Sequence, residues 1–388
     1  MPREPGYRII SGDGYLELPP ERWTKYLPAK YQEPAPRTVK MPDGGDGLAV
    51  GDGDPEPLGA SVTGKPYEEH KNYGVVYEGS PGCGSPEQRL EEQYVDGIDA
   101  EVLFPSNTMN RLWKSVKGGP DAYKAMFRAW NRFLAEEYCV VAPDRLIGMG
   151  LVPDTSVDDA IEELEYCTKA GLKGVDLQAF PNGKGFPLPA DDRFWAAAVS
   201  AGMPITTHSS LGRGQGPVFQ YPRQPERVGG GGGDPVAHMS RFAGQHIRNP
   251  AQLVWAGVFD RFPALRLYFA ETQIGWLPYA IEQFDNTYDR SVHWAEREYG
   301  LEPLERRPSE YVREHFYWGF IYDPIGARLH CEVGADRTMW GSDFPHLSGD
   351  YPYSRQAMDQ TFAQVPDEMK RRMLNANAVE FFNLEPDS

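Results

Sequence analysis

Near the end of the chain, Asp343 and His346 stand three residues apart in a turn that proline closes. Residues 339–346 read MWGSDFPH. The first of them are typical of the end of a buried strand, which Gly341 lets the chain leave and which Pro345 prevents from continuing. A carboxylate and an imidazole at a strand end can bind a metal ion or move protons. An ordinary strand-to-loop turn would look the same, so partners elsewhere in the chain must decide between the two interpretations.

A second group of such side chains lies near the start of the chain. Asp13, Tyr15 and Glu17 occupy alternate positions after two isoleucines. Alternate residues of an extended chain point to one face, so these three oxygen-bearing side chains share one side of the first predicted strand. The alternative is a turn at Asp13 followed by a solvated Glu17.

Eight predicted strands alternate with predicted helices and must position these side chains. The strands span residues 7–17, 98–106, 146–153, 174–180, 203–212, 265–272, 316–322 and 337–343. Helical spacing of apolar residues between them, as in residues 121–140, completes the pattern of a (β/α)8 TIM barrel. A length of 388 residues suits one such barrel with insertions, so we expect a single domain over residues 1–388.

In a barrel of this kind the active site lies at the C-terminal ends of the strands. The candidate side chains fall at such ends. Asp13, Tyr15 and Glu17 belong to the first strand, His208 to the fifth, Glu271 to the sixth and Asp343 to the eighth. This agreement predicts a metal site at the mouth of the barrel. Gln178, at the end of the fourth strand, is expected to line the same pocket.

Residues 34–86 are dense in glycine and proline and interrupt the barrel pattern. Such composition is typical of a loop, but the segment is too long to be a simple connection. We therefore expect an insertion that lies over one end of the barrel and acts as a lid.

The composition of the chain limits which binding partners and which cellular compartment we expect for the protein. A net charge of −17 argues against nucleic acid and anionic membranes as partners. No apolar run approaches the roughly 18 residues of a membrane span. Four cysteines lack paired or metal-finger spacing and the N-terminus lacks an apolar targeting segment, so we expect free thiols and a cytoplasmic protein. A small-molecule or carrier-linked substrate fits best.

Several segments together carry a resemblance to a known family. They read YRIISGDGYLELPPERW, YVDGIDAEVLFPS, TTHSSLG, GVFDRFPALRLYFAETQIGWLPYAIEQFD, WGSDFPH and LNANAVEFFNL. With them the chain resembles the amidohydrolase-related family of metal-dependent TIM-barrel proteins over nearly its whole length. The resemblance implies that His208 and Asp343 bind metal and that Glu271 faces the same centre. It also places His238 where relatives carry an active-site histidine.

The first strand departs from the family pattern. Relatives usually read D-x-H or H-x-H there, with a glutamate just before the first proline. Here Tyr15 takes the histidine position and Leu18 the glutamate position, while Glu17 supplies a carboxylate one residue earlier. Tyr15 could be a phenolate ligand, a donor to a ligand, or a packing residue. We expect His346 to support the ligands rather than to be one.

The resulting donor set is rich in oxygen, which suits iron or manganese better than zinc. Its predicted metal ligands are Asp13, Glu17, His208, His238, Glu271 and Asp343. A set of this size could hold two ions, and a site of that kind can activate dioxygen. The departure is similar to a branch of the same barrel class, the non-haem diiron monooxygenases that hydroxylate CoA-linked diterpenoid substrates.

That similarity implies two irons, dioxygen and an electron donor that the sequence does not identify. A CoA carrier would meet Arg213, Arg223 and Arg227 after the fifth strand. A metal-dependent hydrolase or decarboxylase with zinc or manganese is the second interpretation, and a barrel that has lost its metal is the third. Surface aromatic residues such as Trp113 indicate a homodimer, as in the family.

Overall fold

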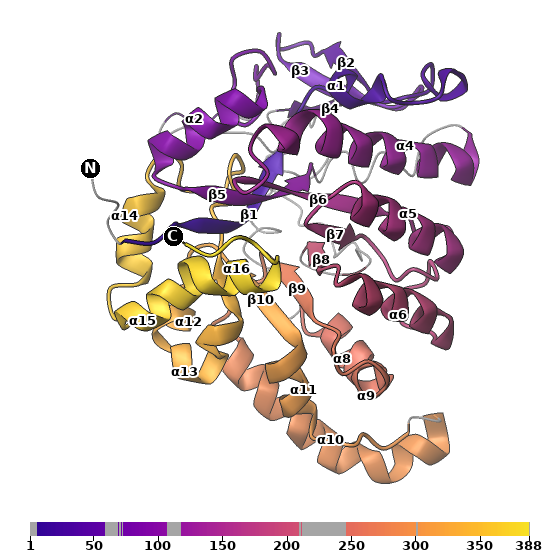
Figure 1. Cartoon of the computed structure of the whole chain (residues 1–388), viewed down its shortest axis with the longest axis vertical. Coiled ribbons are helices and arrows are strands. Elements are labelled where there is room, and N and C mark those ends of the chain that lie inside the picture. Colours follow the sequence, from indigo (N-terminus) through magenta and orange to yellow (C-terminus); the bar gives the residue numbers. More distant parts are fainter. Residues whose placement is uncertain are drawn as a thin grey trace, which may run out of the picture.

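In the computed structural model, eight parallel strands form the barrel that the sequence predicts (Figure 1). The structure describes residues 6–58, 69, 71, 73–106, 118–208, 211, 246–299 and 302–387. The barrel strands are β1 (Ile10–Leu16), β5 (Ala100–Pro105), β6 (Leu146–Val152), β7 (Gly174–Leu177), β8 (Ile205–His208), β9 (Leu267–Ala270), β10 (Phe316–Phe320) and β11 (Thr338–Trp340). Barrel strands that follow one another in this order also pair with one another in the sheet, and each of these pairs is parallel.

The barrel closes where the segment after β11 runs alongside β1. The Tyr15 N–H donates to the Phe344 carbonyl at 2.8 Å, and the Asp343 N–H donates to the Asp13 carbonyl at 3.0 Å. Gly341 permits this approach, because a Cβ there would lie 2.5 Å from the Cβ of Asp13. Closure therefore brings together the two groups of side chains that the sequence singles out.

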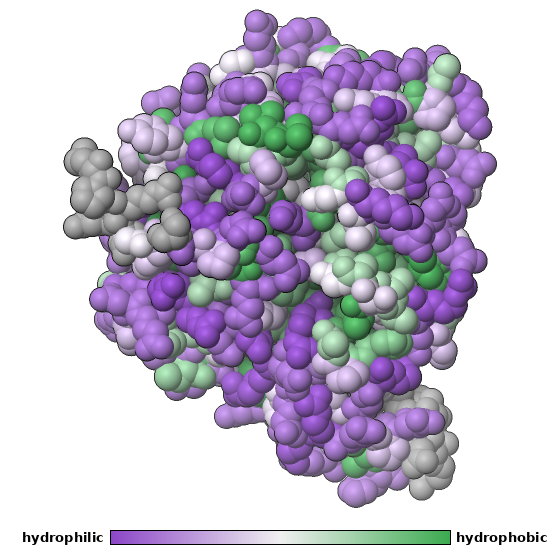
Figure 2. All heavy atoms as spheres, in the orientation of Figure 1, coloured by the Kyte–Doolittle hydropathy of each residue, from purple (hydrophilic) through white to green (hydrophobic). Residues whose placement is uncertain are grey.

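Helices cover the outside of the strands (Figure 1). In the same orientation the surface is mostly hydrophilic, with several hydrophobic patches (Figure 2). The principal ones are α2 (Pro86–Asp96), α4 (Gly119–Phe133), α5 (Val157–Lys169), α6 (Asp192–Ala201), α8 (Arg248–Trp255), α10 (Leu277–Tyr299), α11 (Pro308–His315) and α14 (Ser354–Thr361). Ser156 caps α5 by accepting a hydrogen bond from the Asp159 N–H. Near the C-terminus, α15 (Asp367–Arg371) and α16 (Asn377–Phe381) are separated by a π-helical turn. Within the described residues, no helix is long and apolar enough to cross a membrane.

The glycine- and proline-rich insertion is not simply a loop. Its first part forms an antiparallel sheet of β2 (Arg37–Lys40), β3 (Asp46–Ala49) and β4 (Glu56–Pro57). The buried Asp46 carboxylate accepts the Tyr77 N–H at 2.8 Å, which ties this sheet to the later part of the insertion. Glycine and proline mask the short strands in the sequence, because both residues are rare in strand interiors.

The later part of the insertion lies against the mouth. A Cβ on Gly82 would come within 2.4 Å of the Pro345 side chain, so the two segments are in close contact. Burial, followed by the charge of Glu17, raises the pKa values of Tyr77 and Cys83, which indicates that this carboxylate is near both. The insertion thus packs beside the strand end that carries Glu17.

A buried ion pair joins α2, β5, β1 and the closing segment. The Arg89 Nε lies 2.7 Å from a carboxylate oxygen of Glu101, and both side chains are almost fully buried. Arg89 also donates to the carbonyls of Tyr15 at 3.0 Å and Phe344 at 3.2 Å. Glu101 in turn accepts from the Ser342 hydroxyl. This pair therefore helps to hold β1 and the segment after β11 side by side.

Replacing Arg89 with Met leaves the Glu101 carboxylate buried without its cation. We expect the free energy of unfolding, measured by urea denaturation, to fall by about 3–5 kcal/mol. The matched control is Arg132→Met in the half-exposed Arg132–Glu136 pair, which should cost less than about 1 kcal/mol. Equal losses in the two variants would show that the buried pair does not stabilise the closure.

Candidate metal centre

Three side chains from three strands converge at the mouth of the barrel. They are Asp13 on β1, His208 at the end of β8 and Glu271 directly after β9. Their ligand atoms all lie within 4.8 Å of one another. The His208 Nε2 lies 3.6 Å from an Asp13 oxygen and 3.2 Å from a Glu271 oxygen. Among the described residues, this is the group whose donor atoms could share one ion.

Burial makes a cation at this group favourable. Each of the three side chains is at most 4 % exposed. Two ionised carboxylates withdrawn from water need compensating charge or hydrogen bonds, and a divalent cation supplies that charge. Carboxylate and imidazole together are donors that manganese and iron accept. The residues present therefore fit a single divalent metal ion.

Tyr15 belongs to the same centre. Its hydroxyl donates to a Glu271 oxygen at 3.2 Å and contacts the His208 Nε2. The Tyr15 ring also packs on the His346 ring, with centroids 3.7 Å apart. Phe104 also packs against His208, with ring centroids 5.4 Å apart. Tyr15 thus connects the donor group to a second set of polar side chains.

The second set consists of Glu17, Asp343 and His346. The His346 Nε2 lies 2.9 Å from a Glu17 oxygen, and its Nδ1 lies 3.2 Å from an Asp343 oxygen. Burial lowers the pKa of His346, but the two carboxylates outweigh it and raise the pKa to about 10. Glu17 and Asp343 thus contact His346, whereas the three-donor group consists of Asp13, His208 and Glu271. The backbone of Asp343 still bonds to Asp13, so the two sets are adjacent.

Two of these carboxylates sit on an unusual backbone. Glu271 and Asp343 have φ values of 53° and 54°, in the left-handed region that residues other than glycine rarely adopt. Each lies directly at or shortly after a strand end, β9 and β11 respectively. The Thr272 N–H donates to the Gly319 carbonyl at 2.8 Å and helps to hold the first of these turns. Such conformations persist where the surrounding structure enforces them, and they are common at functional sites.

Other predicted residues have different locations. His238, Arg213, Arg223 and Arg227 lie outside the described residues. Gln178 donates to Asp176, a fully buried carboxylate on β7 that also accepts from the Thr206 hydroxyl. Prediction from sequence did not identify this carboxylate or the Arg89–Glu101 pair. The available signal was an acidic residue inside an otherwise apolar strand, which occurs in both β5 and β7.

Comparisons with known proteins agree with this architecture. The amidohydrolase family model matches residues 52–384. The chain is 22 % identical over 309 residues to the 2-amino-3-carboxymuconate-6-semialdehyde decarboxylase of Dictyostelium discoideum, covering 79 % of this chain and 78 % of the relative. It is 26 % identical over 269 residues to the decarboxylase orsB of Emericella nidulans, covering 68 % and 74 %.

A solved structure extends the agreement in fold over almost the whole chain. The 5-carboxyvanillate decarboxylase of Novosphingobium aromaticivorans, in complex with manganese and 4-hydroxy-3-methoxy-5-nitrobenzoic acid, superposes with a TM-score of 0.66 at 17 % identity. The match covers 98 % of this chain and 97 % of that structure.

These relatives correct the functional prediction. The interpretation as a diiron monooxygenase, an oxidoreductase that uses dioxygen and a CoA-linked diterpenoid, is wrong, because the curated relatives that match most of the chain are decarboxylases. The prediction of two irons is likewise unsupported. The error has a physical origin: the oxygen-rich donor set was taken to indicate iron and dioxygen chemistry. In the structure, Tyr15 contacts His208 and Glu17 is hydrogen-bonded to His346.

The metal content of protein variants can distinguish ligands from supporting residues. We expect Asp13→Asn and His208→Ala to lose most of the bound metal, measured by elemental analysis after manganese loading. Glu17→Gln should retain it, because Glu17 contacts His346 rather than the three-donor group. Circular dichroism serves as the control for folding. Metal loss in Glu17→Gln equal to that in Asp13→Asn would restore Glu17 as a ligand.

Proposed function

Since the chain belongs to the amidohydrolase family, we propose that it is a metal-dependent decarboxylase acting on a small aromatic or conjugated carboxylic acid. The observation that carries the proposal is the buried group of Asp13, His208 and Glu271 at the mouth of the barrel. Decarboxylases among the relatives support the reaction type. The manganese-bound carboxyvanillate decarboxylase, which shares the fold, supports the metal and the class of acid.

In this proposal Asp13, His208 and Glu271 hold one divalent ion, for which manganese is the first candidate. When bound, the ion supplies positive charge that orients and stabilises the oxygens of an anionic substrate. Tyr15 fixes the orientation of His208 and Glu271 through its hydroxyl. Such hydrogen bonds to ligands hold donor atoms in place and set their basicity.

His346 is the proposed proton donor. It lies between two carboxylates and packs on Tyr15, which touches the donor group. In a non-oxidative decarboxylation, the carbon that bears the carboxylate gains a proton, its bond to the carboxyl carbon breaks, and CO2 leaves. No oxidant or reductant takes part. Asp343 and Glu17 hold the imidazolium for this transfer. Neither dioxygen nor an electron donor is required.

The insertion over residues 34–86 is proposed to cover part of the mouth and to help seat the acid within a single domain. Its contact with Pro345 through Gly82, and the nearness of Tyr77 and Cys83 to Glu17, support this role. Loops that cover a mouth exclude water and complete a substrate pocket.

The activity is tested by measuring CO2 release from a panel of hydroxylated benzoic acids by the manganese-loaded protein. We expect turnover that chelator abolishes and manganese restores. His346→Gln should lower kcat by about 10²–10⁴-fold, the usual contribution of a general acid, without changing metal content. The exposed His293→Gln on α10 is the matched control and should leave kcat unchanged. Absence of CO2 release across the panel, or release that persists in Asp13→Asn, would contradict the proposal.

A further inference from the structure

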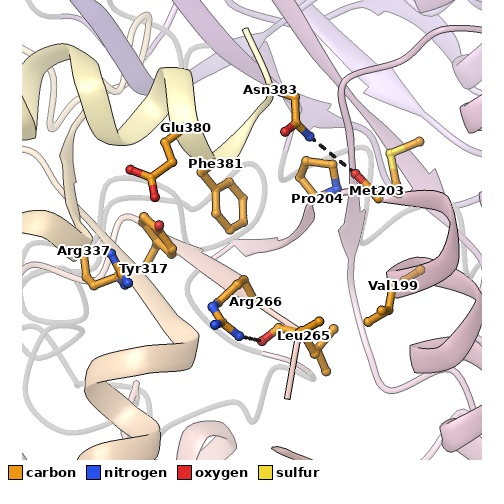
Figure 3. Close-up of a pocket in the computed structure, with 13 residues that line it drawn as sticks. Val199, Met203, Pro204, Leu265, Arg266, Tyr317, Arg337, Glu380, Phe381 and Asn383 are labelled. Atoms are coloured by element: carbon orange, nitrogen blue, oxygen red, sulfur yellow. Dashed lines mark hydrogen bonds between the residues drawn. The ribbon is translucent and has the colours of Figure 1, made fainter. Parts of the chain in front are cut away.

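Figure 3 shows a cavity of about 350 Å³. Its lining residues place it at the opposite end of the barrel from the candidate centre. Its walls come from the N-terminal ends of β8, β9, β10 and β11, and from α16. Pro204 directly precedes β8, whereas His208 ends that strand. At about 3.3 Å per residue, the strand separates the two sites by more than roughly 10 Å. The cavity is therefore distinct from the mouth.

One end of the cavity carries two arginines. The Arg337 guanidinium lies over the Tyr317 ring, 5.0 Å from its centroid, and its Nη1 donates to Asp336. The Arg337 Nε is shielded from water and has no acceptor among the described residues. Because the Nε is shielded, a ligand in the cavity would meet the other guanidinium N–H groups of Arg337, whose side chain is 22 % exposed.

Arg266 adds a second positive charge. It donates to the carbonyls of Pro263 and Leu265 and to Glu314, yet its side chain remains 31 % exposed. Burial lowers the pKa of Arg266, and Arg337 acts in the same direction, while Glu314 opposes them. Both arginines line the cavity, so an anion bound there would be stabilised by their positive charge.

Glu380 is the one carboxylate among the lining residues, and it is already engaged. It lies beside Tyr317 (Figure 3), and one of its oxygens lies 3.3 Å from the Arg372 Nη1. Arg337 pairs with Asp336 and Arg266 with Glu314, but neither of these acids lines the cavity. The cavity wall therefore carries two arginines and one carboxylate in a chain of net charge −17. Such local clusters attract anions despite the global charge.

The other end of the cavity is apolar. Its lining residues there are Ala198, Val199, Met203, Pro204, Leu265 and Phe381. The Phe381 ring extends this wall beside Tyr317, with the two ring centroids 4.8 Å apart. A cationic end joined to an apolar wall, in a volume of this size, matches a small ligand with an anionic group and an apolar body.

We propose that this cavity is a second ligand site, which binds a small monocarboxylate with an aromatic or branched aliphatic body. The carboxylate binds Arg337, whose planar guanidinium suits two carboxylate oxygens, with Arg266 supplying further charge. The body packs on Val199, Pro204 and Phe381. The site is independent of the metal centre and of the proposed reaction.

Benzoate is the probe, and isothermal titration of the full-length Asp13→Asn variant measures this site apart from the metal centre. We expect binding in Asp13→Asn and at least about a tenfold loss when Arg337→Met is added. The control is Arg371→Met, an exposed arginine on α15 that does not line the cavity, which should leave affinity unchanged. Val199→Trp, which fills the apolar end, should also abolish binding and keeps the test decisive if Arg337→Met fails to fold.

Three results would overturn the proposal. The first is equal benzoate affinity in the Arg337→Met and Arg371→Met variants. The second is undetectable benzoate binding to Asp13→Asn at about 10 mM, a concentration that reveals even weak sites. The third is inorganic phosphate binding as tightly as benzoate, which would show that the apolar wall contributes nothing and that the ligand class is wrong.

Discussion

Closure of the barrel between its first and last strands is the constraint on which the candidate centre depends. Two backbone hydrogen bonds join β1 to the segment after β11, and they place Asp13 beside Asp343. Gly341 makes the approach sterically possible. Arg89, buried in its pair with Glu101, donates hydrogen bonds to a backbone carbonyl of each segment. A change that loosened this closure would displace the metal donors and the proposed proton donor together.

Within that frame, Tyr15 divides the mouth into two chemically different sets. Its hydroxyl touches His208 and Glu271, which can hold an ion, and its ring packs on His346, which sits between two acids. In the proposed reaction, charge stabilisation and proton delivery would therefore lie side by side without sharing a residue. A decarboxylation needs both functions close to one carbon, and it needs no oxidant. The arrangement is consistent with the reaction of the curated relatives.

Much of the fold is accessible to sequence analysis because buried parallel strands are short apolar runs that end in recognisable turns. All eight predicted strands coincide with observed ones, and the strand ends correctly bring Asp13, His208 and Glu271 together. The partners of Glu17 could not be predicted from the sequence. The alternation of side chains along a strand shows which residues share a face, but not which residues contact that face. β1 ends at Leu16, so Glu17 lies beyond the strand and contacts His346. The types of donor residue alone also led to the wrong reaction. A tyrosine at the usual histidine position can support a metal site without making that site activate dioxygen.

Binding of one divalent ion among Asp13, His208 and Glu271 can be tested by anomalous diffraction at the manganese edge, from crystals of the manganese-loaded protein. We expect one peak within about 2.2 Å of a donor atom from each of the three side chains, the bond length typical of such ligands. Two peaks at the mouth, or a single peak held by Glu17 and Asp343 instead, would contradict it.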